Sequence, residues 1–142
     1  LGLSSHRGWI ARWADVLNPP TLPTAGSLDV REFSRDTAFV FGRDTVFAYS
    51  VPGHTPGAAV YLFRGTLFAG DAVGFTRWGG FGSARPGYSD DTERAAESLK
   101  DLWPRLPKGA VRYVCTAHAH CAPLDDRFMR DVAPGDARLT GA

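Results

Sequence analysis

The sequence lacks long hydrophobic runs and has few cysteines. No apolar stretch approaches the roughly 20 residues of a transmembrane helix, and residues 1–17 lack the apolar core of a signal peptide. We therefore expect a soluble protein with no membrane partner. Cys115 and Cys121 are too few for a disulfide-stapled mini-domain, so a reducing cytoplasm is the default location. We expect buried or free thiols, with a short-loop disulfide or a thiolate metal site as alternatives.

An excess of charge of one sign is also missing. The chain has 16 Lys and Arg against 15 Asp and Glu, for a formal net charge of +1 at pH 7, and the two signs interleave. This balance gives no electrostatic reason to expect nucleic acid as a partner. A small-molecule substrate or another protein chain is the better expectation.

What the chain does have is enough apolar material for one domain. Its 142 residues are 44% hydrophobic and 12% aromatic, which suits a single domain with a real core. Within residues 1–28 we expect a helix over 6–17, from its helical spacing of apolar residues, and then a proline-rich loop. Residues 29–142 should hold the sheet, a second helix and the polar motifs.

Short runs of β-branched and aromatic residues predict the strands. The predicted strands cover residues 29–33, 37–41, 45–51, 58–63, 66–69 and 110–115. Glycines in "FGRDT" and "FRGT" fit tight reversals, so the flanking runs should pair as antiparallel hairpins. Asp90 and Glu93 have the spacing of a capping box, which predicts the start of a helix that ends before Pro104. A short helix is expected over 124–132.

Three polar sites each follow a predicted strand. His54 follows the strand over 45–51, Asp71 follows "TLFAG", and His118 or His120 follows "VRYVC". Side chains at strand ends are held by a rigid sheet and can converge at one edge. Two imidazoles and a carboxylate suit zinc, iron or manganese. Each residue alone is better explained by a turn, cap or surface-loop contact, so it is the order and context of all three together that predict a metal site.

These motifs resemble the metallo-β-lactamase superfamily. "VPGHTPGAAVYLF", "TLFAGDAV", a capped helix and "VRYVCTAHAH" are similar to the C-terminal half of that family, over about Thr45 to His118. The resemblance implies an α/β fold of the αββα-sandwich type, with mainly antiparallel strands and flanking helices. We expect this chain to hold only the C-terminal half or a shortened version of it.

The resemblance also implies roles for the three residues. His54 is similar to a histidine of the first metal site, Asp71 to the carboxylate that bridges two metals, and His118 to the last histidine, of the second site. His120 is the alternative register. The "GD" aspartate resembles thioesterases, lactonases and glyoxalase II more than true β-lactamases. The implied cofactor is Zn²⁺, one ion or two, with iron or manganese as alternatives.

The implied reaction is hydrolysis of an ester, thioester or lactone. A metal-activated hydroxide would attack the carbonyl, and the metal would stabilise the developing oxyanion. Asp71 would contribute to catalysis by fixing the metals and orienting this nucleophile. No protein nucleophile would be needed.

One family motif does not occur in this chain. The His-x-His-x-Asp-His signature is missing, and His6 is the only histidine before His54. The chain, which begins at Leu1, is expected to be the C-terminal part of a longer hydrolase. Alternatively, it is a half-domain that pairs with another chain or with itself to cover a sheet face, or a degenerate relative that binds without turnover.

The glycine-rich loop over residues 73–89 is the expected substrate contact. It directly follows Asp71 and could form an apolar wall beside the metal, although sealing the sheet edge would explain its aromatic residues equally well. These aromatic residues are Phe75, Trp78, Phe81 and Tyr88. Arg77 and Arg85 are candidates for holding a substrate carboxylate, but solvated loop arginines are more common.

Overall fold

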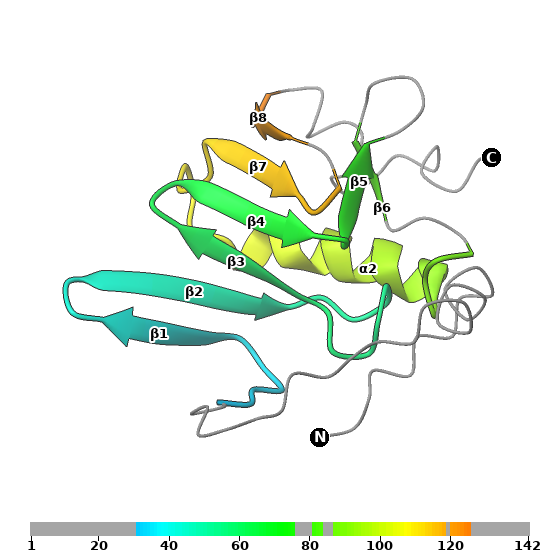
Figure 1. Ribbon diagram of the computed structural model, residues 1–142, viewed down its shortest axis with the longest axis horizontal. Coiled ribbons are helices and arrows are strands. Elements are labelled where there is room, and N and C mark those ends of the chain that lie inside the picture. The colour runs from blue at the N-terminus through cyan, green and yellow to red at the C-terminus, as the bar shows by residue number, and fades with distance from the viewer. Residues whose placement is uncertain (1–30, 76–80, 84–86, 119, 126–142) are drawn as a thin grey trace.

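The described part of the chain forms a six-stranded mixed sheet with a helix packed on one face, and a small two-stranded sheet (Figure 1). The computed structural model describes residues 31–75, 81–83, 87–118 and 120–125. The strands are β1 Thr37–Phe41, β2 Asp44–Ser50, β3 Ala59–Phe63, β4 Thr66–Gly70, β5 Val73–Phe75, β6 Phe81–Ser83, β7 Tyr113–Thr116 and β8 Cys121–Pro123. The helix α2 spans Thr92–Leu102 and continues into a 3-10 turn, η1, over Trp103–Arg105.

The strand order brings three strand ends to one edge of the sheet. The order is β1-β2-β3-β4-β7-β8, with antiparallel neighbours from β1 to β4, a parallel pair β4–β7, and an antiparallel pair β7–β8. The connection from β4 to β7 contains the β5–β6 hairpin and α2. β2, β4 and β7 therefore run in the same direction, and their C-terminal ends share an edge.

Both predicted hairpins are confirmed. The β1–β2 reversal places Gly42 at a φ of +60°, and the β3–β4 reversal places Arg64 and Gly65 at +47° and +85°. Two successive positive φ values are those of a type I′ turn, whose twist matches that of the flanking strands. The guanidinium of Arg64 donates to both carboxylate oxygens of Asp44, at 2.7 and 3.0 Å, which ties the two reversals together.

The predicted strand over 29–33 is wrong where the structure describes it. Residues 31–33 are not a strand. The ring of Phe33 instead packs edge-on against Phe39 and Tyr61, with centroids 5.7 and 6.4 Å away. Shortly after it, the carboxylate of Asp36 accepts a hydrogen bond from the backbone N–H of Ser50, at 3.0 Å. The β-prone residues here serve side-chain packing, because β propensity does not supply a partner strand.

Two predicted element boundaries also shift. The last long strand begins at Tyr113, not at residue 110, because the N–H groups of Arg112 and Tyr113 both donate to the carbonyl of Gly65 at the β3–β4 turn. The N-cap of α2 is Asp91, not Asp90, since the Asp91 carboxylate accepts from the N–H of Arg94 at 2.9 Å. The sequence "SDD" offers two adjacent aspartates for this role.

Three other predictions fall partly or wholly outside the described residues. The helix over 6–17 lies outside them. Of the helix expected over 124–132, residues 124 and 125 are not helical and the rest lies outside. The predicted loop over 73–89 contains the β5–β6 hairpin, and its residues 76–80 and 84–86 are not described. Among the residues that are described, no helix is long and apolar enough to cross a membrane.

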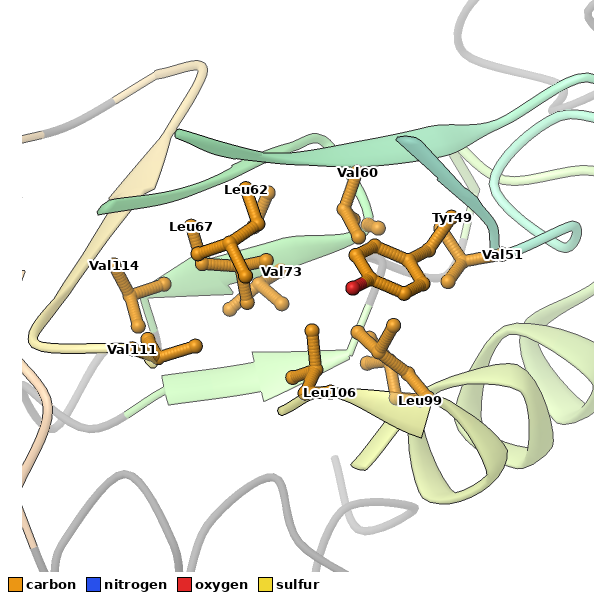
Figure 2. Packing of buried hydrophobic residues seen from close by; sticks show 13 residues of the cluster. Tyr49, Val51, Val60, Leu62, Leu67, Val73, Leu99, Leu106, Val111 and Val114 are labelled. Atoms are coloured by element: carbon orange, nitrogen blue, oxygen red, sulfur yellow. The ribbon is translucent and has the colours of Figure 1, made fainter. Parts of the chain in front are cut away.

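The core lies between the sheet and α2 (Figure 2). Leu99 and Leu102 of the helix pack toward apolar residues of the strands, where Val60, Leu67 and Val114 are at most 1% exposed. Tyr49 borders this core, and its burial, with a further effect of the Asp36 carboxylate, raises the pKa of its phenol. The buried residues alternate along each strand, and their burial fixes which face of the strand points inward.

The other face of the sheet carries exposed aromatic side chains. Tyr61 and Phe68 lie directly opposite each other in the β3–β4 register, on the face away from Leu62 and Leu67. Tyr61 is 39% exposed and Phe68 is 44% exposed, and Tyr113, on the same face of β7, is 47% exposed. We call this surface, defined by Tyr61, Phe68 and Tyr113, the aromatic face.

Candidate metal centre

The structure brings His54, Asp71 and His118 together at the shared edge. They follow β2, β4 and β7, whose C-terminal ends meet there. The Oδ2 atom of Asp71 lies 3.7 Å from Nε2 of His54, and its Oδ1 atom lies 3.1 Å from Nε2 of His118. The side chain of His54 is 15% exposed, that of Asp71 38% and that of His118 88%. One carboxylate thus contacts both imidazoles. The His54 side of the carboxylate is mostly buried, and the His118 side is open to solvent.

The "VPGHTPG" loop that carries His54 is bound to the start of α2. The carbonyls of Gly53 and His54 accept hydrogen bonds from the N–H groups of Asp91 and Asp90, at 2.9 and 3.0 Å. Gly53 has a φ of +145°, and a Cβ on it would lie 2.3 Å from the Cα of Ala95. Only glycine allows this loop to approach the helix so closely.

The imidazole of His54 also has a partner on its other nitrogen. Its Nδ1 atom lies 3.2 Å from Oγ of Ser89, a side chain that is 8% exposed. The two nitrogens of the ring therefore face Ser89 and Asp71. Ser89 was not identified from the sequence, where its only signal is its place just before a helix cap.

Asp71 and His118 are held together through backbone contacts. Gly70, at a φ of +55°, precedes Asp71 and ends β4, and its carbonyl accepts a hydrogen bond from the N–H of Ala117 at 3.0 Å. Gly70 also pairs with Thr116 after a register shift in the β4–β7 ladder. This irregularity sits directly beneath the two side chains, as bulges next to functional sites commonly do.

The loop that carries His118 is closed by a disulfide. Cys115 of β7 and Cys121 of β8 lie opposite each other in the antiparallel register and are bonded. The expectation of free thiols is thus wrong. It did not include the β7–β8 hairpin, which places the two cysteines opposite each other. The cytoplasmic location rested on reduced thiols and stays a prediction. The hairpin places His118 against Asp71, although both His118 and His120 are exposed.

The donors present fit part of a metal-ligand set. Ligands about 2.0–2.2 Å from a tetrahedral ion are about 3.3–3.6 Å apart, and the two contacts of Asp71, 3.1 and 3.7 Å, lie on either side of that range. Among the described residues, however, no three His, Cys, Asp or Glu side chains form a group that could hold a metal ion. The two histidines contact different oxygens of Asp71, so the arrangement consists of two pairs that share one carboxylate.

The structure describes only part of the loop over residues 73–89, which was expected to contact the substrate. Tyr88 is 44% exposed, and Phe75 pairs with Phe81 across the β5–β6 ladder. The remaining candidates, Trp78, Arg77 and Arg85, lie outside the described residues. A role of this segment in substrate contact therefore stays a prediction.

Comparison with known proteins supports a likeness to one superfamily. No protein-family model matches the chain. The hydroxyacylglutathione hydrolase of Anaeromyxobacter dehalogenans (strain 2CP-C) is 30% identical to it in an alignment of 128 residues that covers 86% of this chain and 47% of that protein. The fold is similar to the B3 metallo-β-lactamase BLEG-1, with a TM-score of 0.60 and 22% identity over 91% of this chain and 57% of that one. These matches support the metallo-β-lactamase superfamily as the family that this chain resembles.

A second solved structure agrees with this assignment. A metallo-β-lactamase superfamily protein from Sulfolobus tokodaii has a TM-score of 0.52 and 24% identity, over 70% of this chain and 38% of that one. At identities of 22% and 24%, these two structures show a similar fold and nothing more. The chain spans about half the length of the curated relative that it matches. The expected shortened α/β fold of the metallo-β-lactamase type is thereby confirmed.

Proposed function

We propose that this chain supplies metal ligands and a catalytic carboxylate to a metal-dependent hydrolase. The observation that carries the proposal is the contact of one carboxylate, Asp71, with both His54 and His118. These side chains come from three separate strand ends, and a sheet edge with convergent donors is a usual place for a metal site. The match to a protein named as a hydrolase supports the reaction class.

The proposed cofactor is Zn²⁺, with iron or manganese as alternatives. Such an ion, when bound, acts as a Lewis acid that makes water nucleophilic near neutral pH and polarises a carbonyl group. His54 and His118 would each present the lone pair of Nε2 to it. Asp71 would contribute one oxygen and keep the other as a hydrogen-bond acceptor, which orients a water molecule for attack.

The proposed substrate is an ester, thioester or lactone. By its name the curated relative hydrolyses a hydroxyacylglutathione, so the glutathione thioester of a hydroxy acid is the first compound to assay. The open side of the site, where the His118 side chain is 88% exposed, leaves room for a small-molecule acyl group to approach. His54, whose side chain is 15% exposed, lies on the more buried side of Asp71.

The direct test is metal content with and without Asp71. Protein reconstituted with zinc, iron or manganese and then desalted should retain metal, and Asp71→Ala should lose most of it because the shared ligand is gone. Asp44→Ala is the matched control, since Asp44 lies at the opposite end of β2, beside Arg64. Elemental analysis measures the outcome. A wild type without metal, or equal retention by Asp71→Ala, would contradict the proposal.

A second candidate function is an interaction module that pairs with a second copy of this chain. The exposed aromatic face of the sheet favours it, because apolar side chains gathered on one surface commonly mark a protein contact. Light scattering on the same samples separates the two functions. A dimer with little metal and no hydrolysis of the thioester favours the module, whereas a monomer that retains metal contradicts it.

A further inference from the structure

We propose that Ser89 is a positioning residue that orients the imidazole of His54 for metal binding. The inference rests on the proposed metal site and deepens it. Its basis is the 3.2 Å contact between Oγ of Ser89 and Nδ1 of His54, across 35 positions of sequence. Ser89 is 8% exposed, so little bulk water is available to compete for the ring nitrogen.

The start of α2 holds this serine in place. The next two residues, Asp90 and Asp91, donate their N–H groups to the carbonyls of His54 and Gly53. Three consecutive residues before the helix thus bind two consecutive residues of the loop. The hydroxyl of Ser89 has a fixed position relative to the ring because both are attached to the same rigid backbone junction.

The chemistry of imidazole makes this contact consequential. A metal at Nε2 requires the lone pair there, so the proton of the neutral ring must be on Nδ1. The Oγ atom of Ser89 can accept that Nδ1–H bond and so selects the correct tautomer and ring orientation. A hydroxyl can also donate, so the contact survives when the metal is absent and Nε2–H points to Asp71. Partners of this kind on a ligating histidine typically affect metal affinity by about 10–100-fold.

A second serine provides the matched control. The hydroxyl of Ser98 in α2 donates to the carbonyl of Pro52 at 2.7 Å, so it ties the same loop to the helix without touching the imidazole. Ser98→Ala therefore removes a loop contact only. Ser89→Ala removes the ring contact while leaving the N–H bonds of Asp90 and Asp91 intact.

The experiment compares the zinc dissociation constants of the wild type, Ser89→Ala and Ser98→Ala by chelator competition. Ser89→Ala is expected to raise the zinc dissociation constant by about 10–100-fold, whereas Ser98→Ala should raise it by less than about threefold. This difference is expected even if both variants lower the thermal midpoint of unfolding equally. In the zinc-loaded wild type, NMR should show a slowly exchanging Nδ1 proton of His54, which Ser89→Ala removes and Ser98→Ala keeps.

The outcomes separate this inference from the proposed function. Unchanged zinc affinity in Ser89→Ala, or equal losses in both serine variants, would overturn the role of Ser89 and leave the metal site standing. A wild type that binds none of zinc, iron and manganese would overturn both. Loss of the Nδ1 proton signal together with weaker zinc binding, in Ser89→Ala alone, supports the positioning role.

Discussion

At the scale of single residues, Gly53 determines where His54 can lie. It combines a φ of +145° with a close approach to Ala95, whereas Gly57 in the same loop has nothing within 4 Å of a hypothetical Cβ. The two glycines of "VPGHTPG" look alike in the sequence. Only one of them is required by packing, and it is the one directly before His54.

Gly53→Ala should destabilise the fold by about 3 kcal/mol. The new methyl group must push the loop away from α2, and the alanine must adopt a backbone conformation that is unfavourable for any residue with a Cβ. Gly57→Ala should change the free energy of unfolding by less than about 0.5 kcal/mol. Denaturant unfolding of both variants measures the difference. Equal effects at the two positions would show that the loop is not packed on the helix as described.

At the scale of elements, α2 serves both as core and as the support of the metal-ligand loop. Its buried side, with Leu99 and Leu102, packs on the sheet, and the backbone just before it binds the "VPGHTPG" loop. The Asp91 side chain caps the helix while its N–H holds Gly53. These two functions of one residue can be separated by mutation.

Asp91→Ala should cost about 1 kcal/mol of stability through loss of the cap. Zinc affinity should fall by far less than the about 10–100-fold expected for loss of a partner of the histidine ring, because the backbone bond from Asp91 to Gly53 remains. Asp101→Ala, on the exposed side of the same helix, is the control and should cost less than about 0.5 kcal/mol. Thermal unfolding and chelator competition check the two expectations. A large loss of zinc affinity in Asp91→Ala would mean that the cap itself positions His54.

Local signals predicted β1 to β4, β7 and α2, but they missed β5, β6, β8 and the long-range pairing. Glycine positions predicted the β1–β2 and β3–β4 hairpins, because the turn residues and their strands are adjacent in the sequence. The parallel pairing of β4 with β7 depends on a crossover of more than 40 residues, about which local patterns say nothing.

The candidate site was predicted only in part for the same reason. Strand ends indicated His54, Asp71 and His118, and the structure places these residues side by side. Ser89 escaped notice because its contact joins residues 35 positions apart. The Cys115–Cys121 disulfide was left as an alternative because two cysteines carry no information on strand register.

At the scale of the whole molecule, α2 covers one face of the sheet, whereas the aromatic face is partly exposed and has Phe33 packed against its Tyr61. The site lies at an edge of this sheet, where Asp71 is 38% exposed and His118 is 88% exposed. Since the chain matches about half of its curated relative, we propose that further ligands reach this edge from residues outside the described part or from a partner. The three donors identified here should nevertheless bind one ion or a bridged pair of ions.

Anomalous diffraction from zinc-loaded crystals tests this claim most directly. We predict an anomalous peak about 2.0–2.2 Å from Nε2 of His54, an oxygen of Asp71 or Nε2 of His118, with all three residues among the ligands of one ion or of a bridged pair. Such a pair would be about 3.5–4 Å apart. A zinc ion bound only elsewhere, for example at His120, or no peak at this edge in zinc-saturated crystals, would contradict the account.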